Sequence, residues 1–240
     1  MYEERTYRRM MQSEGLKNFT VVEGESDLHV SANRNLEKIT RSTLINTRRQ
    51  LLEYIKLHPD FHHSLVPINV DAMAPPIIHR MAKAAKIANV GPMAAVAGAV
   101  AESVGISLLP YSKEILVENG GDLFIKSERT KKVLIHAGDS PFSEKLALSI
   151  KPSSFPLGIC TSSGKIGHSL SFGNADGVVA ISQNICLADA AATAIANRVK
   201  TSDDIKNALS WGKALPGICG LLIIIDNQLG TWGDLVLTRP

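Results

Sequence analysis

The segment LADAAATAIANRV, residues 187–199, carries three polar side chains at a spacing that a helix would align. Asp189, Thr193 and Asn197 follow at i, i+4 and i+8, so they lie along one face of a helix. The other residues up to 196 are apolar and mostly alanine, which is typical of a buried helix. Since an isolated buried carboxylate is costly, one explanation is a hard cation bound by Asp189 and the Thr193 hydroxyl. The other is that Asp189 is simply an N-cap.

The stretch CTSSGKIGHSLSFGNADG, residues 160–177, combines hydroxyls and glycines with Lys165 and His168 after a strand-like run. Backbone N–H groups exposed in such a loop bind anions, and Lys165 adds positive charge. The glycine spacing is not that of a P-loop, and Ile166 stands where that motif requires Ser or Thr. The competing interpretation is a polar turn between strands, with His168 as a structural hydrogen-bonding residue.

The stretch VENGGDLFI, residues 117–125, has the composition of a buried strand but is interrupted by Gly120 and Gly121. Glycine weakens a strand because it adds backbone entropy and supplies no side chain to pack. The pair could form a bulge or a hairpin corner, with Asp122 facing water. Alternatively, the missing side chains let a ligand approach the backbone, while Asp122 accepts a hydrogen bond from it.

The elements that position these residues follow from hydrophobic periodicity. Strand-like runs occupy the first thirty residues, and helices are predicted from Asn33 or Asn35 to Pro59, from Pro75 or Pro76 to Asn89, and after Pro92. From residue 113 the predicted strands are KEILVEN, GDLFIK, KKVLIHAG, KLALSI, PLGICTSSG and GVVAIS. Two helices, LADAAATAIANRV and TSDDIKNALSWG, precede a closing hairpin of GICGLLIIIDN and WGDLVLT. Strands and helices in blocks favour an α+β fold.

Composition narrows the class of protein. With 240 residues, 45% of them hydrophobic, the chain can form one large core or two fused smaller ones. A net charge of +3 and dispersed arginines with few aromatics give no support for nucleic-acid binding. Three isolated cysteines argue against a disulfide scaffold or a zinc knuckle and suit a reducing cytoplasm. The N-terminus lacks the apolar core of a signal peptide, and the most apolar run is too short for a membrane span. We therefore expect a soluble cytoplasmic protein with no membrane partner.

Taken in order, these stretches resemble the ApbE superfamily, whose members move FMN from FAD onto a protein threonine or serine. ENGGDLFI is similar to that family's N-x-GGD segment, TSSG…GH to its T-S-G loop and histidine, and ADAAAT to its magnesium helix. GPMAAVAGAVAESVG falls where the family has a small-residue helix. A closer resemblance, nearly end to end, is to a little-characterised prokaryotic branch of the superfamily, found mainly in anaerobic archaea and bacteria.

The resemblance implies a fold and a set of site residues. The fold is α+β, with two T-fold-like ββααββ units that have antiparallel sheets and pack face to face around the ligand, in a single domain 1–240 whose halves divide at about 1–112 and 113–240. The metal, Mg²⁺, would be bound by Asp189, Thr193 and the backbone near Ala94. Asp189 and His168 would act in catalysis. The residues assigned to the cofactor, FAD or FMN, are Gly120, Gly121, Asp122, Ser162, Ser163, Gly164 and Lys165.

The chain also departs from the superfamily pattern. Ala97 replaces a lysine of the small-residue helix, and Ser171 and Phe172 stand where Asp and Pro would follow the histidine. The leading hypothesis is a Mg²⁺-assisted FMN transferase or FAD pyrophosphate hydrolase, with a flavin nucleotide and a protein acceptor as partners. The alternatives are a flavin- or nucleotide-binding protein without turnover, and an accessory protein of anaerobic sulfur and homocysteine metabolism with a persulfide on Cys160. A homo-oligomer is compatible with each of them.

Overall fold

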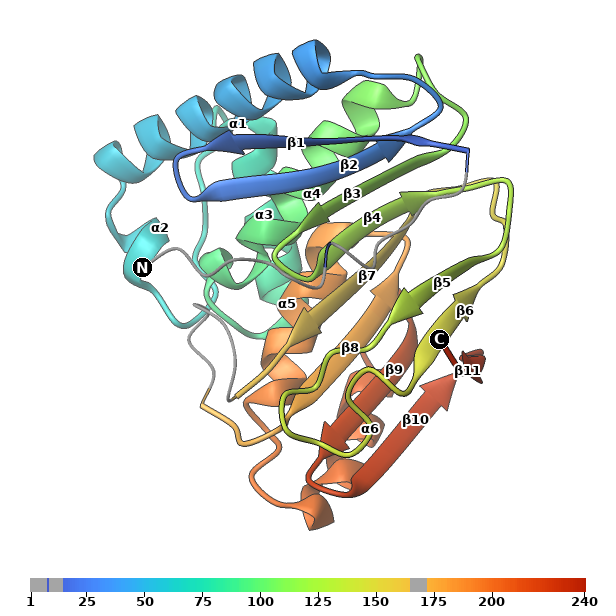
Figure 1. Ribbon diagram of the computed structural model, residues 1–240. Helices are drawn as coiled ribbons and strands as arrows, with labels where there is room; N and C mark the ends of the chain where they lie inside the picture. The colour runs from blue at the N-terminus through green and yellow to red at the C-terminus, as the bar shows by residue number, and fades with distance from the viewer. Residues whose placement is uncertain (1–7, 9–14, 165–171) are drawn as a thin grey trace.

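The computed structural model describes residue 8 and residues 15–164 and 172–240 (Figure 1). These residues form an eight-stranded sheet and a separate three-stranded sheet, together with the helices that pack on the larger one. All strand pairs in both sheets are antiparallel. The predicted α+β class with antiparallel sheets is confirmed.

The large sheet consists of two units with the same order of elements. The first unit contains β1 Lys17–Glu23, β2 Ser26–Ala32, α1 Glu37–Leu57, α2 Asp60–His63, α3 Pro76–Ala88, η2 Pro92–Ala95, α4 Val96–Leu108, β3 Ile115–Asn119 and β4 Asp122–Lys126. The second contains β7 Leu157–Ser162, β8 Gly177–Ser182, α5 Ile185–Ala196, η3 Ser202–Asp204, α6 Ile205–Lys213, β9 Ile218–Ile225 and β10 Gln228–Gly233. Each unit thus has two strands, then helices, then two strands.

The two units are joined edge to edge, which differs from the face-to-face packing that the resemblance implies. The strand order is β1-β2-β3-β4-β7-β8-β9-β10, and β4 pairs with β7, with Leu123 opposite Ile159. This pairing satisfies the backbone groups that both strands would otherwise leave open at an edge. The helices of both units therefore cover the same face of one continuous sheet (Figure 1).

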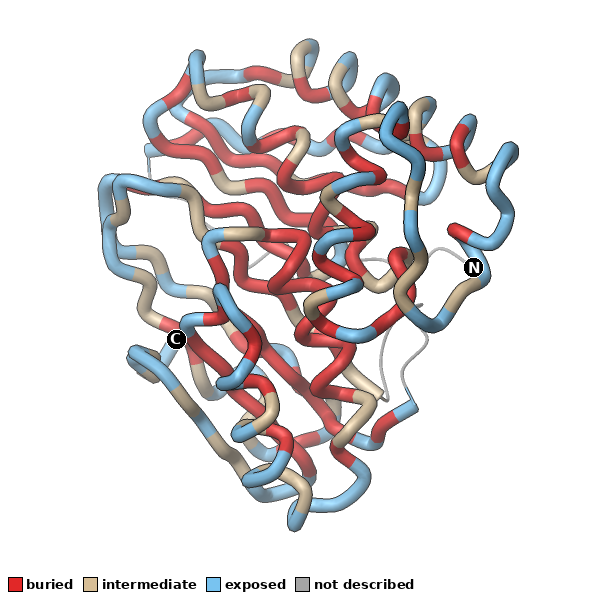
Figure 2. The backbone as a smooth tube through the Cα atoms, turned by 180° about the vertical axis from the view of Figure 1, so that it is seen from behind, coloured by how far each residue is buried: buried red, intermediate tan, exposed pale blue. Residues whose placement is uncertain are grey.

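The small sheet covers part of the other face. It contains β5 Lys131–Leu134, β6 Ala147–Ile150 and β11 Leu237–Thr238 in the order β11-β6-β5. Strand alternation in β4 shows how the sheet serves two cores: Phe124 packs in the helix-side core, while Leu123 and Ile125 pack in the core beneath the small sheet. Buried residues accordingly concentrate in the middle strands and the helices against them (Figure 2).

Most predicted elements are present, and the differences have local causes. The N-cap of α1 is Leu36, so the prediction of Asn33 or Asn35 was wrong. Asn35 nevertheless accepts the N–H of Glu37, whereas Asn33 accepts the backbone N–H groups of Lys113 and Glu114 across the fold. The helix predicted from Pro75 or Pro76 is α3, which ends where Asn89 adopts a left-handed conformation.

The predicted closing hairpin was partly wrong. The partner of β9 is β10, Gln228–Gly233, while Leu237 and Thr238 cross to β6 in the small sheet. Asp226 has a positive φ of 52° and supplies the tight turn directly after β9, so the second strand begins earlier than its hydrophobic pattern indicates.

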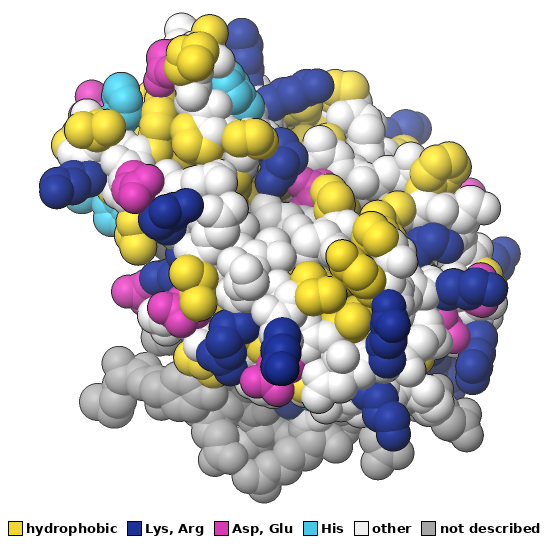
Figure 3. All heavy atoms as spheres, turned by 90° about the horizontal axis from the view of Figure 1, so that it is seen from above, with side chains coloured by type: hydrophobic (Ala, Val, Ile, Leu, Met, Phe, Trp, Pro, Cys, Tyr) yellow, Lys and Arg dark blue, Asp and Glu magenta, His cyan; other side chains and the backbone are white. Residues whose placement is uncertain are grey.

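The distribution of basic side chains and the length of the apolar helices can be compared with what the composition predicts. Lys and Arg side chains are spread over the face seen from above (Figure 3), in keeping with a net charge of +3. Within the described part of the chain, no single helix is long and apolar enough to cross a membrane. The consecutive helices Pro76–Ala88 and Pro92–Leu108 pass the length and composition test only as a pair, bent by 105°.

Candidate functional site

The diglycine stretch is a two-residue hairpin turn between β3 and β4. Asn119 pairs with Asp122, and the intervening Gly120 and Gly121 have φ values of 67° and 102°. Successive positive φ angles require glycine in such a turn, so the backbone conformation alone accounts for both residues. The hairpin-corner interpretation is therefore correct in geometry. Asp122, however, does not face water, because it is 5% exposed on the helix side of the sheet.

Asp189 is not the N-cap of its own helix. That position is Asn184, whose side chain accepts the N–H of Leu187. Asp189 is instead buried, and its Oδ2 accepts the N–H of Gly98 at 2.8 Å. Gly98 lies in the first turn of α4, so Asp189 satisfies a helix N-terminus that belongs to the other unit. A Cβ on Gly98 would lie 2.8 Å from the Asp189 Cβ, so only glycine allows this approach.

The β3–β4 turn reaches the same helix end. Asn119 Nδ2 donates to the carbonyl of Ala97 at 3.0 Å, one residue before the N–H that Asp189 accepts. The diglycine turn, the first turn of α4 and the middle of α5 therefore meet at one place. This convergence brings together Asp122 and Asp189, which are 67 residues apart in sequence (189 − 122).

Burial raises the pKa of both carboxyl groups, and the charge of Asp189 adds to the effect on Asp122. Burial raises the pKa of Asp189 to about 7, against the opposing effect of the N–H groups of Gly98 and Ala97. Burial, and then the charge of Asp189, raises the pKa of Asp122 well above its usual range. Two carboxylates in one buried place are unfavourable, so this region favours a bound proton or a positive charge beside them.

Two buried oxygens in this region have no hydrogen-bond partner among the described residues. They are Oδ1 of Asp122 and Oγ of Ser162, at the end of β7. Buried polar atoms in native proteins nearly always have a hydrogen-bond partner. These two unpaired oxygens, one of which belongs to the Asp122 carboxyl group itself, therefore indicate a place where a ligand binds. Of the neighbouring predicted residues, Ser163 Oγ donates to the Ala175 carbonyl at 3.4 Å.

Other predicted site residues occupy varied positions. The N–H of Gly164 already donates to the carbonyl of Ala175 at 2.9 Å, which fixes the start of the serine-rich loop by a backbone bond. Thr193 is buried one turn after Asp189 on α5, and Ala94 is half-buried in η2, which packs on α5. Lys165 and His168 lie outside the described residues.

A charged cluster behind the diglycine turn was not predicted from the sequence. Glu118 is 2% exposed, and its Oε1 accepts the N–H of Gly121 at 3.2 Å. Its Oε2 accepts from Arg8 Nε at 2.6 Å, and Arg8 also donates to Oδ1 of Asp27 at 2.7 Å. These contacts hold the diglycine turn from the face opposite Asp122. In the sequence, this cluster is indicated only by one charged residue, Glu118, within a strand-like run. No residue near Glu118 in the sequence identifies Arg8 as its partner.

The geometry can be compared with known proteins. A family model described as AbpE bacteria matches residues 8–229. The chain belongs to this family. Among its relatives is a UPF0280 protein of Methanococcus aeolicus, 36% identical over 224 residues, covering 91% of this chain and 90% of that protein. Another is a UPF0280 protein of Methanothrix thermoacetophila, 40% identical over 200 residues, covering 82% and 84%.

Solved structures extend the family likeness to the fold. The apo form of the Pseudomonas stutzeri flavinyl transferase ApbE aligns with a TM-score of 0.57 at 11% identity, covering 90% of this chain and 93% of that one. The flavin transferase ApbE from Vibrio cholerae aligns with a TM-score of 0.58 at 10% identity, covering 91% and 97%. At this identity the likeness establishes the fold, and the predicted membership of an ApbE-like branch is confirmed.

Proposed function

We propose that this family member binds a flavin nucleotide, FAD or FMN, with the help of Mg²⁺ where the diglycine turn, α4 and α5 converge. The observation that carries the proposal is the pair of buried carboxyl groups, Asp122 and Asp189, with the charge of Asp189 raising the pKa of Asp122. A divalent cation would relieve this repulsion, and its phosphate ligands would complete the coordination shell.

The residues present fit a cation in their chemistry. Asp189 would bind it through carboxylate oxygen, Thr193 through its hydroxyl, and Ala94 through its carbonyl. Oxygen donors of this kind are those that Mg²⁺ prefers. The described residues contain no group of three or more His, Cys, Asp or Glu side chains that could hold a metal ion, so the proposed set relies on one carboxylate, one hydroxyl and one carbonyl, with nucleotide phosphates as the further ligands. When bound, Mg²⁺ would neutralise charge on the nucleotide pyrophosphate.

The remaining groups would recognise the nucleotide itself. Asp122 Oδ1 and Ser162 Oγ, which are buried and unpaired, would hydrogen-bond to it, with Ser163 and the diglycine turn alongside. Gly120 and Gly121 offer backbone without side chains at this point. We include Lys165 and His168 among the residues that act on the nucleotide only because the sequence resembles the superfamily motif at these positions.

Two reactions are compatible with this site. In transfer, the hydroxyl oxygen of a protein acceptor attacks the FMN phosphorus, the bond from that phosphorus to the bridging oxygen breaks, and AMP leaves. In hydrolysis, water replaces the acceptor. In both, the attacking hydroxyl loses its proton to water, and Asp189 would take part by holding the cation, because its Oδ2 already accepts the N–H of Gly98. The first reaction is favoured because both structural neighbours are flavin transferases.

Binding without turnover is the second candidate, and one observation favours it. Ala97 stands in place of the lysine of the superfamily motif, and its carbonyl is occupied by Asn119 Nδ2. The position is therefore used to hold the diglycine turn and supplies no positive charge for a leaving phosphate.

A persulfide on Cys160 gains no support. Cys160 is fully buried in β7, and burial, followed by the charge of Asp122, raises the pKa of its thiol well above its usual range. A reactive thiol needs the opposite, an exposed group with a lowered pKa.

Isothermal titration of purified protein with FAD, with and without Mg²⁺, tests the proposal. Mg²⁺-dependent binding that Asp189→Asn removes and the surface variant Asp203→Asn retains would support it. Release of AMP in the same mixture would identify turnover, and binding without AMP would identify the second candidate. FAD affinity that is absent, or equal with and without Mg²⁺, would overturn the cation's role at this site.

A further inference from the structure

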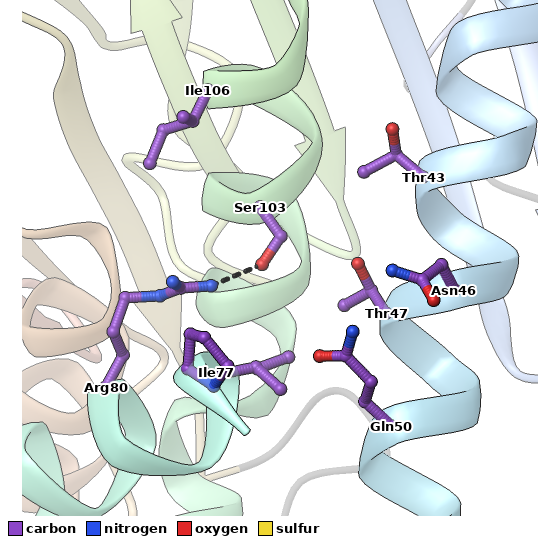
Figure 4. Close-up of a pocket in the computed structure, with 9 residues that line it drawn as sticks. Thr43, Asn46, Thr47, Gln50, Ile77, Arg80, Ser103 and Ile106 are labelled. Carbon is purple, nitrogen blue, oxygen red and sulfur yellow. Dashed lines mark hydrogen bonds between the residues drawn. The ribbon is translucent and has the colours of Figure 1, made fainter. Parts of the chain in front are cut away.

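A second hollow lies among the helices of the first unit, and it shares no residue with the candidate site. It has a volume of about 190 Å³ and opens between α1, α3 and α4 (Figure 4). At about 30 Å³ per water molecule, this space holds roughly six waters or a small organic molecule. It is too small for a dinucleotide such as FAD.

The α1 side of this hollow is lined by polar side chains. Thr43, Asn46, Thr47 and Gln50 are spaced i, i+3, i+4 and i+7, and their side chains point toward α3 and α4 (Figure 4). Thr47 is 6% exposed. The packed stripe of α1 contains Thr47 together with Leu44 and Leu51, whereas Asn46 is exposed and Thr43 and Gln50 are partly exposed at the rim of the hollow.

Several of these polar groups have unused hydrogen-bonding capacity. Thr43 Oγ1 donates to Ser107 Oγ at 3.1 Å, and Asn46 Oδ1 accepts from Arg49 at 2.9 Å. Within the described part of the chain, the Thr47 hydroxyl, the Gln50 amide and the amino group of Asn46 make no hydrogen bond with protein. Uncharged donors are therefore available on one wall.

The opposite wall supplies one positive charge. Arg80 on α3 donates from Nη2 to Ser103 Oγ at 2.6 Å, and the Ser103 hydroxyl in turn donates a hydrogen bond to the Ala99 carbonyl at 2.7 Å. Arg80 Nε lies 3.2 Å from Glu102 Oε2, but the geometry is not that of a hydrogen bond, and Nε–H has no acceptor among the described residues. Among the described residues, no Asp or Glu lines the hollow itself, and the carboxylate nearest to Arg80 is that of the buried Glu102 in this ion pair.

We propose that this hollow binds a small molecule through an anionic group, a carboxylate or a phosphate, held by Arg80. The planar guanidinium is suited to both groups, because two of its N–H bonds can donate in parallel to two oxygens. Thr47, Gln50 and Asn46 then donate to the remaining oxygens. The site is independent of the flavin-nucleotide proposal, because its residues and its size differ.

Nuclear magnetic resonance of the full chain provides a local test, with inorganic phosphate and succinate as probes at constant ionic strength. The side-chain amide signals of Gln50, assigned by their absence in Gln50→Leu, should shift and saturate with at least one probe. The amide signals of Gln228, exposed on β10, should not move. Comparing the two probes distinguishes a phosphate source from a carboxylate source.

Variants show whether the stated contacts hold the anion. Gln50→Leu should weaken affinity, measured by isothermal titration, about threefold to tenfold, the usual effect of one hydrogen bond. Arg80→Gln should abolish saturable binding, while Arg34→Gln, an exposed arginine on another surface, should leave it unchanged. Since Arg80→Gln also leaves Glu102 without its ion pair, Gln50→Leu tests the site if the arginine variant fails to fold. Non-saturable shifts with both probes, or equal affinity in Gln50→Leu, would overturn the proposal.

Discussion

Replacing Asp189 by asparagine should remove a large pH dependence from the stability of the protein. Burial raises the pKa of Asp189 from an ordinary value of 3.8 to about 7. In the unfolded chain the group is exposed and titrates near its ordinary value. As the pH rises from 3.8, the unfolded state loses its proton first, so the free energy of unfolding falls. The stability that this group provides is complete below pH 3.8 and is lost once the pH has risen through about 7.

The size of this effect follows from the shift in pKa. A change from 3.8 to about 7 corresponds to about 4 kcal/mol at 1.36 kcal/mol for each pKa unit. Asparagine keeps an oxygen that can accept the N–H of Gly98 but carries no charge, so its contribution is constant. The free energy of unfolding of the natural chain, less that of Asp189→Asn, should therefore fall by about 4 kcal/mol between roughly pH 4 and pH 8.

Urea unfolding followed by circular dichroism, with a chelator present, measures this difference at each pH. Asp203→Asn is the matched control, because it makes the same chemical change at an exposed carboxyl group and should show no comparable trend. Adding Mg²⁺ above pH 7 should stabilise the natural chain but not Asp189→Asn, since only the native carboxylate binds it. A difference in stability that stays constant over this pH range would show that burial does not raise the pKa of Asp189 and would refute the reasoning.

Two glycine substitutions separate backbone strain from steric overlap, and chemical denaturation measures both. Gly121→Ala should cost about 1–2 kcal/mol because φ is 102°, although its Cβ would meet nothing closer than Thr161 Cβ at 4.0 Å. Gly105→Ala should cost about 1–3 kcal/mol, because its Cβ would lie 2.4 Å from the Phe124 ring. Adding Phe124→Leu should recover part of the loss in Gly105→Ala and none in Gly121→Ala; equal recovery in both would contradict this distinction.

The fold followed from sequence wherever the deciding forces are local. Proline at the start of α3 and the left-handed residue Asn89 at its end delimit a helix without reference to the rest of the chain. The same holds for the strands on either side of the diglycine turn, which alternate between two cores. The β9–β10 hairpin was misplaced because WGDLVLT has strand periodicity, while its position in the small sheet depends on contact with β6.

The candidate site could be predicted from the sequence only in part. The sequence identified Asp122 and Asp189 as residues of interest but left open whether either faced water or capped its own helix. The partner of Asp189 is the N–H of Gly98, 91 residues away, and the residue that holds Glu118 is Arg8, 110 residues away. Contacts at such separations leave no periodic pattern, since each partner has the composition expected of its own element.

Local sequence predicted most of the strands and helices and the glycines of the β3–β4 turn, and it singled out Asp122 and Asp189, but it misplaced the partner of β9. Tertiary structure alone decided that the two units share one sheet through β4 and β7, and that a turn from one and a helix from the other enclose two carboxyl groups. The reason is physical: backbone preference and hydrophobic period act over a few residues, whereas burial and the mutual repulsion of charges depend on what the folded chain places nearby.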